Sequence, residues 1–295
     1  MDGILVIRKE KGYTSHDVVA KLRGILHMKK IGHTGTLDPA AEGVLPVALG
    51  KGTRLVELLT EKEKTYEAVL RLGVSTDTQD MTGAVLSEKP VTVTEEEVRE
   101  AVGSFVGEQL QIPPMYSALK VNGKKLYELA REGKTIERKP RPVVFYEIRI
   151  LDMELPLVRI SVTCSKGTYI RALARDLGRA CESAAHISAL RRTASGVVSI
   201  GACHAVEELS PESAAGFALD PIAALGATRV DLPGNLADDL LCGRRIPIER
   251  ALADFDASKA PFALVLDGGL KALARIESGR FVMEHVFPQA IGGVR

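Results

Sequence analysis

Residues 32–39 form the segment best suited to chemistry, with the sequence Gly-His-Thr-Gly-Thr-Leu-Asp-Pro. It holds one histidine, two hydroxyls and one carboxylate between glycines that permit close approach of the backbone to a ligand. Pro39 disfavours helical geometry at the residue before it, which predicts an extended backbone at Asp38. Because the segment contains no second acid to share a proton, we expect an ionised carboxylate suited to act as a nucleophile or to stabilise charge. Taken one residue at a time, the segment also fits an ordinary turn with a capping aspartate.

Apolar and alternating runs surround this segment and predict the elements that position it. Gly3–Ile7 reads as a short strand, and Ser15 is the expected N-cap of a following helix that buries residues such as Val18 and Leu22. Residues 64–73 alternate between apolar and polar side chains, which predicts a strand with Tyr66 on its buried face.

The middle of the chain continues the mixture of strands and helices. The spacing of Thr94 and Glu97 predicts a capping box at the start of a helix, and Asn122-Gly123 predicts a hairpin turn after Lys120. The remaining expected elements are a helix over 125–131, strands over 143–151 and 157–164, and a helix over 169–181. Since no regular βαβ repeat is present, the prediction is an α+β fold.

The composition changes near residue 205, and a second domain is expected after it. Residues 205–228 are rich in Ala, Ser and Pro, and short turn-bounded strands follow. The expected strands cover 229–232, 246–248, 262–266, 271–277 and 281–287. We therefore predict a domain over 1–225 and a small β-rich module over 226–295.

The net charge of +1 is unevenly distributed along the chain. Residues 116–145 carry eight basic side chains against three acidic ones, whereas residues 205–262 carry five against ten. A local basic segment is typical of a surface that contacts phosphates, but it is also typical of ordinary solvated surface.

The composition also bounds the class of protein. No stretch of 18 or more apolar residues predicts a membrane span, so we expect no membrane association and a cytoplasmic protein. The four cysteines are dispersed without a CxxC pair, which argues against a zinc site and a disulfide framework. We expect no metal and no cofactor, because the sequence holds no phosphate-binding glycine motif or cluster of ligands.

Several long segments, in order, resemble one family. They are GHTGTLDPAAEGVLPVALG at 32–50, KTYEAVLRLGVSTDTQDMTG at 64–83, IPPMYSALKVNGKKLYELAREG at 112–133, SKGTYIRALARDLG at 165–178 and AAHISALRR at 184–192. Together they resemble the TruB-type pseudouridine synthases, which isomerise a uridine in the TΨC arm of tRNA. The resemblance covers residues 3 to about 192. It implies a pseudouridine-synthase catalytic domain with a mixed, largely antiparallel central sheet flanked by helices, and places a PUA-like RNA-binding domain at 226–295.

The resemblance also implies the catalytic residues. Asp38 is the catalytic carboxylate, Arg171 is its ion-pair partner, and Tyr66 stacks on the flipped uracil. An arginine suits this role because its planar group holds a carboxylate in a fixed bidentate geometry. The carboxylate could attack C1′ of the ribose, take a proton from C2′ or add to C6 of the base, and the sequence does not choose among these. The isomerisation adds and removes no atoms, in keeping with the expected absence of a cofactor.

Further positions correspond to residues that meet the RNA. The resemblance places His33 where a ring fills the space left by the extruded base, Asp80 near the flipped bases, and Leu190 in the lining of the pocket. Lys9 and Lys120 are expected to contact the RNA, although Lys9-Glu10 stands where the family often has Lys-Pro, which leaves the role of Lys9 open. The implied partner is the TΨC stem-loop of tRNA, bound by a monomer that needs no partner protein.

Two other functions remain open at this stage. An RNA-binding or RNA-folding protein without chemistry would use the same basic segment, but it would have no need of a carboxylate beside phosphates. The catalytic subunit of a guide-RNA-dependent pseudouridylase would share the Asp38 loop and the C-terminal module. Activity on bare tRNA would separate the stand-alone enzyme from such a subunit.

Overall fold

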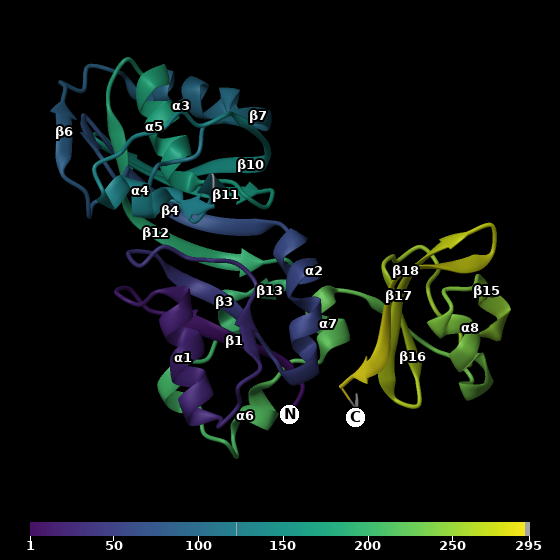
Figure 1. Ribbon diagram of the computed structural model, residues 1–295. Helices are drawn as coiled ribbons and strands as arrows, with labels where there is room; N and C mark the ends of the chain where they lie inside the picture. Colours follow the sequence, from purple (N-terminus) through teal and green to yellow (C-terminus); the bar gives the residue numbers. More distant parts are fainter. Residues whose placement is uncertain (122, 293–295) are drawn as a thin grey trace. The chain divides into compact units, whose positions relative to one another are not determined.

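The structure is a computed structural model that describes residues 1–121 and 123–292. The chain forms two compact units (Figure 1). The first unit comprises Met1–Pro39, Gly43–Thr60 and Ser195–Arg295, and the second comprises Ala40–Glu42 and Glu61–Ala194. Among the described residues, no helix is long and apolar enough to cross a membrane.

A small antiparallel sheet covered by one helix carries the Asp38 loop in the first unit. Strand β3 (Glu42–Leu49) pairs with both β1 (Gly3–Lys9) and β2 (Ile31–His33). Helix α1 (Ser15–Ile25) buries Val18, Val19 and Leu22 in a cluster with apolar residues of β1 and β3. The amphipathic pattern of this helix is thereby confirmed.

The start of α1 differs from the expectation. Thr14, not Ser15, is the N-cap: its hydroxyl accepts a bond from the amide of Asp17, whose carboxylate accepts one from the amide of Thr14. The prediction for Ser15 was wrong because this reciprocal capping box satisfies two helix amides. Ser15 is left buried inside the unit, where it has another partner.

The C-terminal module is a five-stranded sheet with its own core. Its strands lie in the order β14, β16, β17, β18, β15, and the five predicted strands are confirmed. Their bounds are β14 (Thr228–Asp231), β15 (Ile246–Pro247), β16 (Phe262–Leu266), β17 (Gly269–Glu277) and β18 (Arg280–Ile291). Phe255, Phe262 and Phe281 meet in the core, with ring centroids 5.5–6.0 Å apart.

The module also shares a hydrophobic cluster with the rest of the first unit. Ile4 and Leu55 belong to the same buried cluster as Ile222, Val265 and Ile291. Residues before and after position 225 therefore contribute to one buried hydrophobic cluster. The division of the chain at 225 remains a prediction.

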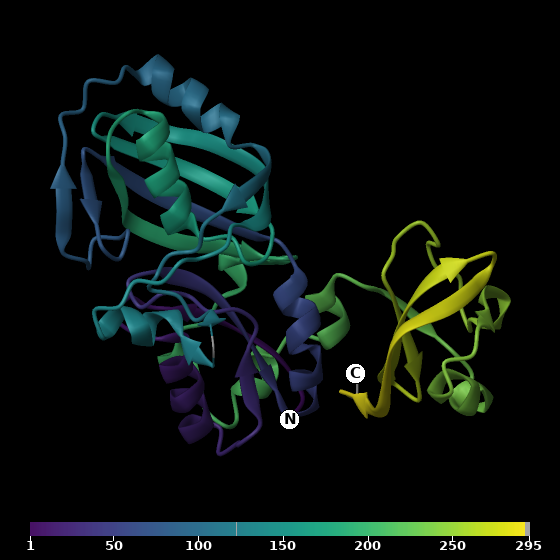
Figure 2. The same ribbon diagram turned by 45° about the horizontal axis from the view of Figure 1, so that its top comes forward.

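The second unit is built on a larger sheet in which β12, β4, β11, β10 and β7 are neighbours in that order. The pairs β4–β11, β11–β10 and β10–β7 are antiparallel. The strands are β4 (Lys64–Leu72), β7 (Gly107–Gln111), β10 (Arg141–Glu154), β11 (Leu157–Cys164) and β12 (Ala185–Ser195). Helices α3 (Glu95–Ser104) and α5 (Ile170–Ala180) cover one face (Figure 2). The α+β fold with a largely antiparallel sheet flanked by helices is confirmed.

Shorter elements complete the two units. The hairpin β8 (Lys120–Val121) and β9 (Lys124–Lys125) precedes α4 (Leu126–Arg131), and β5 (Val74–Thr76) pairs with β6 (Val85–Glu88). Asn122, the predicted turn residue, lies outside the described residues. The capping box of Thr94 and Glu97 is confirmed. The remaining elements are α2 (Val56–Glu61), β13 (Val198–Ser199), α6 (Ala214–Phe217), α7 (Pro221–Leu225) and α8 (Ala237–Leu241), with 3-10 turns at Gly50–Leu55, Ile200–Ala202, Val206–Glu208, Gly234–Leu236 and Ile248–Arg250.

Candidate active site

The loop that carries Asp38 is anchored at two positions that precede the acid in the chain. Thr34 is fully buried, and both its amide and its hydroxyl donate to the carbonyl of Pro46, at 3.1 and 3.4 Å. Leu37 is 3% exposed, and its amide donates to the hydroxyl of Ser15 at 2.9 Å. These neutral anchors fix the backbone at residues 34 and 37, so the half-buried Asp38 follows a rigidly placed neighbour.

Lys9 ties the end of this loop to the end of β1. Its side chain is fully buried, and its ammonium group donates to the carbonyls of Glu10 at 2.9 Å and Pro39 at 3.4 Å. The amide of Gly12 donates to the same Pro39 carbonyl at 2.8 Å. A buried cation is costly unless it is hydrogen-bonded, and these bonds place the positive charge beside the residue that follows Asp38. Direct contact of Lys9 with RNA remains a prediction.

His33 is the last residue of β2 and lies opposite Val47 of β3. The side chain is half-buried, and the amide of Gly35 donates to its Nδ1 at 3.4 Å. The backbone of Gly35 has a φ of +146°, which L side chains rarely adopt. This glycine therefore permits the tight turn that brings its amide to the histidine ring.

In the second unit, Arg171 lies at the start of α5 in a buried network. Its two terminal nitrogens donate to the carbonyls of Thr78 at 2.9 Å and Tyr116 at 2.8 Å, and one lies 3.9 Å from Oδ2 of Asp80. The arginine is 4% exposed. Two backbone carbonyls thus set the plane of the guanidinium group. The Tyr116 hydroxyl donates to Asp77 at 3.3 Å, and burial, followed by that carboxylate, raises the pKa of the tyrosine.

Asp80 is held inside its own turn. Its Oδ1 accepts bonds from the hydroxyl of Thr78 at 2.8 Å and from the amide and hydroxyl of Thr82 at 2.9 and 2.6 Å. Its carbonyl accepts a bond from the hydroxyl of Thr76 at 2.7 Å. Asp80 is 8% exposed as a residue, and its carboxylate shapes the turn that supports Arg171.

Tyr66 and Leu190 lie on neighbouring strands. Tyr66 is on the buried face of β4, opposite Val162 of β11, and is 9% exposed, which confirms the predicted alternation. Leu190 is half-buried on β12, the strand beside β4. The exposed Lys120 begins the β8–β9 hairpin, and no carboxylate within the described ranges lies within 4 Å of its ammonium group.

Comparison with known proteins shows the family to which this chain belongs. Residues 23–170 match the TruB family pseudouridylate synthase N-terminal domain. Over 294 residues the chain is 41% identical to the tRNA pseudouridine synthase B of Burkholderia pseudomallei, covering 97% of each chain. The chain belongs to the TruB family of pseudouridylate synthases. As a TruB-family member it is a pseudouridine synthase, an isomerase that acts on RNA.

Other TruB-family relatives agree. Identity is 45% over 262 residues to the tRNA pseudouridine synthase B of Ralstonia pickettii, covering 86% of this chain and 82% of that one. It is 47% over 223 residues to that of Bacillus subtilis, covering 73% and 72%. Among solved structures, a Cbf5-Nop10-Gar1 complex contains a chain with a TM-score of 0.69 and 27% identity, covering 96% of this chain and 84% of that chain.

The expected TruB-family residues are divided between the two units. Asp38, His33 and Lys9 belong to the first, and the other expected residues belong to the second. In the second unit Arg171 lies beside Asp80, and Tyr66 and Leu190 lie on neighbouring strands. An ion pair of Asp38 with Arg171 would join residues of the two units and remains a prediction.

The sequence did not point to the supporting groups. These are the Ser15 and Thr34 hydroxyls and the backbone carbonyls of Thr78 and Tyr116. For Ser15, the available signal was the position of a serine on the buried side of α1.

Proposed function

We propose that this chain converts one uridine of the tRNA TΨC loop, position 55 by family resemblance, to pseudouridine, with Asp38 as the catalytic carboxylate. One observation carries the proposal: a loop with a single acid is fixed by Ser15, Thr34 and Lys9. A displacement of a reacting group by about 1 Å can cost roughly 100-fold in rate, so such anchoring suits a group that must meet one carbon atom of a substrate.

Arg171 is proposed as the cation that holds Asp38 in its reactive orientation. Support comes from its guanidinium plane, which the carbonyls of Thr78 and Tyr116 orient. A planar guanidinium in a fixed position can present two parallel N–H groups to a carboxylate. Lysine has a single ammonium centre and would not keep the same set of bonds.

Base extrusion is proposed to precede the chemistry, because the reacting C1′–N1 bond of a stacked nucleotide is out of reach. Tyr66 would stack on the extruded uracil, and Leu190 would line the same pocket. Their positions on adjacent strands support this assignment. His33 would fill the vacated space, for which a flat ring on the end of a strand is suited.

Residues 226–295 are proposed to form a PUA-like module that helps hold the tRNA, with Lys120 and Asp80 contributing from the catalytic domain over 1–225. Lys9 is proposed to act mainly by holding the end of the Asp38 loop at Pro39, because its side chain is buried. We also propose that the protein works as a cytoplasmic monomer without a partner protein, a metal or a cofactor.

In the decisive experiment, the purified chain is incubated with an unmodified tRNA transcript, which is then treated with carbodiimide. Stops of reverse transcription at the carbodiimide adducts map the positions of pseudouridine. One stop at position 55, absent with Asp38→Asn, is the expected result. Stops elsewhere, or persistence of the stop in the variant, would overturn the site or the catalytic assignment respectively. An RNA-binding protein without chemistry would bind the transcript and produce no stop.

A guide-RNA-dependent subunit is the second candidate, because the solved structures similar to this chain include an H/ACA particle bound to a substrate RNA. Relatives named tRNA pseudouridine synthase B are 41–54% identical to this chain, against 27% for the chain of the Cbf5-Nop10-Gar1 complex and 25% for that of the H/ACA particle. Turnover of bare tRNA without guide RNA or added protein is therefore expected. Activity that requires either addition would favour the second candidate.

A further inference from the structure

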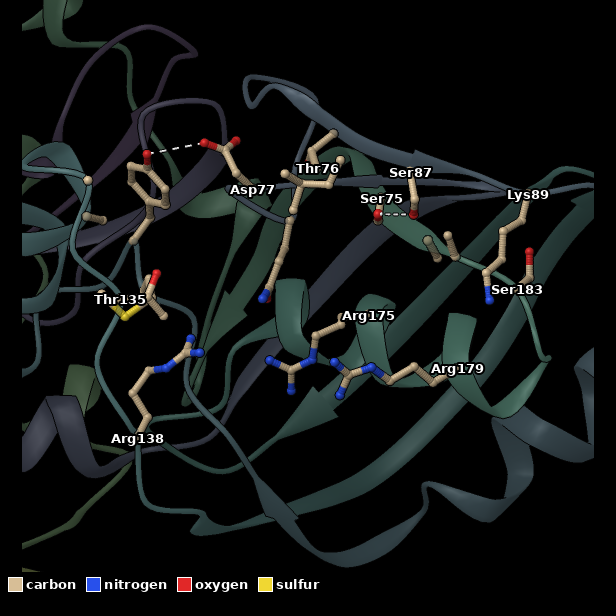
Figure 3. A pocket seen from close by; sticks show the side chains of 18 of the residues that line it. Ser75, Thr76, Asp77, Ser87, Lys89, Thr135, Arg138, Arg175, Arg179 and Ser183 are labelled. Carbon is tan, nitrogen blue, oxygen red and sulfur yellow. Dashed lines mark hydrogen bonds between the residues drawn. The ribbon is translucent and has the colours of Figure 1, made fainter.

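A cavity with a basic lining lies in the second unit, next to the turn that ends at Asp80. It measures about 560 Å³ and lies between the β5–β6 hairpin, the segment after α4 and the second half of α5 (Figure 3). We call it the basic cavity. Its cationic lining residues are Lys89, Lys134, Arg138, Arg175 and Arg179. The one carboxylate in the lining, Asp77, already accepts bonds from the Ala84 amide and the Tyr116 hydroxyl.

Arg138 has few partners of its own. One terminal nitrogen donates to the carbonyl of Pro113 at 3.0 Å, whereas its Nε is buried and has no hydrogen-bond partner among residues 1–121 and 123–292. No carboxylate in those ranges lies within 4 Å of it. Burial, and then the positive charge of Arg175, lowers the pKa of Arg138. A charged group in such surroundings is stabilised by an anion.

Arg175 and Arg179 share one acid. Arg175 donates to both oxygens of Asp176 at 2.8 Å and to the carbonyl of Ile112 at 3.1 Å. Arg179 lies 3.7 Å from the same Asp176, with 69% of its side chain exposed. In Figure 3 the guanidinium groups of Arg138 and Arg175 are turned toward one another. Lys134 pairs with Glu132 at 2.7 Å. With Asp77, Asp176 and Glu132 all counted, the five cations around the cavity still exceed the three acids.

We propose that the basic cavity binds a phosphate group of the substrate RNA, next to the nucleotides that occupy the active site. This inference rests on the proposed function. Arginine forks are suited to phosphate because they donate in two parallel directions to its oxygens. Asp176 pairs with Arg175 and Arg179 and leaves Arg138 without a counter-charge. A phosphodiester would bring one negative charge to Arg138.

The location favours the phosphate of a polynucleotide over that of a free nucleotide. Arg175 follows Arg171 by one turn of α5, a rise of about 6 Å, and the turn residues Asp77 and Gln79 next to Asp80 line the cavity. Lys134 and Arg179 are largely exposed, so the cavity opens widely to solvent. An open site adjoining the reaction centre suits a chain that continues across it, whereas a small nucleotide would be better held by enclosure.

Binding of unmodified tRNA transcript across a series of KCl concentrations tests the proposal. The double variant Arg138→Gln/Arg175→Gln is compared with Arg99→Gln/Arg149→Gln, which removes two exposed arginines of the same unit outside the cavity. Each lost phosphate contact removes about 0.7–0.9 from the slope of log K against log [salt]. We expect the slope of the cavity variant to fall by roughly one such step and its Kd to rise about tenfold, with a far smaller change in the control.

A second variant, Lys89→Gln/Arg179→Gln, changes only exposed side chains of the cavity and so keeps the test valid if the first variant does not fold. Unchanged slopes and dissociation constants in the folded cavity variants would overturn the proposal.

Calorimetric titration with inorganic phosphate and with uridine monophosphate distinguishes the sources of phosphate. Weak binding of both, lost in the cavity variant, is expected. Tight binding of the mononucleotide, together with unchanged tRNA binding in the variant, would assign the cavity to a free nucleotide and overturn the RNA proposal. Failure of the proposed function would look different: the wild-type chain would make no pseudouridine, whatever the salt slopes.

Discussion

The Asp38 loop and the basic cavity use polar groups in opposite ways. The loop is fixed by hydrogen bonds of Thr34 to Pro46 and of Leu37 to Ser15. Lys9 of β1, which bonds to the end of the loop at Pro39, is fully buried. The cavity has five cations, of which several face solvent. Lys134 pairs with Glu132, and Arg175 and Arg179 share Asp176, whereas Arg138 has no carboxylate within 4 Å among the described residues. Rigid anchoring suits a group that reacts, and exposed, under-neutralised charge suits a group that binds. Substitutions in the Asp38 loop should therefore change mainly the reaction rate, and substitutions in the basic cavity mainly the affinity for tRNA.

The largest effect is expected for Asp38→Asn. Removing the only carboxylate of the loop should lower the single-turnover rate by at least about 10³-fold, of the order that loss of an acid–base group or nucleophile causes. The Kd for tRNA should stay within a few fold, because the substitution leaves the loop anchors in place. Asp152→Asn, an exposed residue of β10, is the matched control. A large loss of binding in Asp38→Asn would break the separation of rate from affinity.

Arg171→Lys is expected to lower the rate by roughly 100-fold, as loss of a single positioned charge donor does. The lysine would keep the charge, but its single nitrogen lacks the planar fork with which Arg171 reaches Thr78 and Tyr116 through separate nitrogens. Arg159→Lys, in which the replaced arginine pairs with Glu67 at the surface, provides the comparison. Equal rates for the two variants in single-turnover assays would contradict the role of Arg171.

The β8–β9 hairpin offers a test of affinity alone. Lys120 is exposed and without a nearby acid, whereas Lys124 lies 3.6 Å from Glu132 and Lys125 bonds to Tyr127. Replacing Lys120, Lys124 and Lys125 together by Gln should weaken tRNA binding up to about tenfold and lower its salt slope by about one unit, because one exposed lysine should dominate. A slope equal to that of the wild type would mean that this hairpin is only solvated surface.

Ser15→Ala should have a smaller effect on both rate and stability. The loss leaves the buried amide of Leu37 without its partner, at a cost of about 1–3 kcal/mol. The melting temperature should fall by several degrees, and the rate should fall several-fold because the loop before Asp38 loosens. Ser104→Ala removes a hydroxyl that donates to a carbonyl at the exposed end of α3 and should change neither. An unaltered rate in a destabilised Ser15→Ala protein would show that the anchor serves only the fold.

The sequence predicted elements with strong local signals and missed interactions that depend on distant partners. The alternation around Tyr66, the capping box of Thr94 and the five strands of the C-terminal module are local patterns, and all are confirmed. The prediction of Ser15 as N-cap was wrong because Thr14, with Asp17 three residues later, forms the capping box instead. Sequence reasoning had no means to recognise that the Ser15 hydroxyl would bond to Leu37, 22 residues away.

The basic cavity was missed for a related reason. The charge count pointed to residues 116–145 as one segment, yet of its eight basic side chains only Lys134 and Arg138 line the cavity. The other cations come from the β6 end and from α5, where Arg171, Arg175 and Arg179 recur every four residues. That spacing places three arginines on one side of a helix and was the signal available. Which of them would be buried depended on packing that the local sequence does not encode.

The smallest predicted effect concerns Lys64 of β4. This lysine is buried, whereas Lys134 and Arg179 of the basic cavity are exposed to solvent. Burial, followed by the charge of Arg192, lowers the pKa of Lys64 from its ordinary 10.5 to about 8. Between about pH 8 and 10.5 the unfolded chain therefore holds more protons than the folded one, so the contribution of this lysine to the free energy of unfolding rises with pH across that window. Below pH 8 the lysine is charged in both states and its contribution is constant.

Thermal unfolding of wild type and Lys64→Met from pH 7 to 10 measures this contribution. Relative to the variant, the wild type should gain roughly a few degrees in melting temperature as the pH rises through the window, after allowance for solvent screening. Lys51→Met removes an exposed lysine and should run parallel to the wild type at every pH. If wild type and Lys64→Met also run parallel, Lys64 keeps its proton in the folded protein. The contrast between a buried cation of the sheet and the open cations of the cavity would then lose its energetic basis.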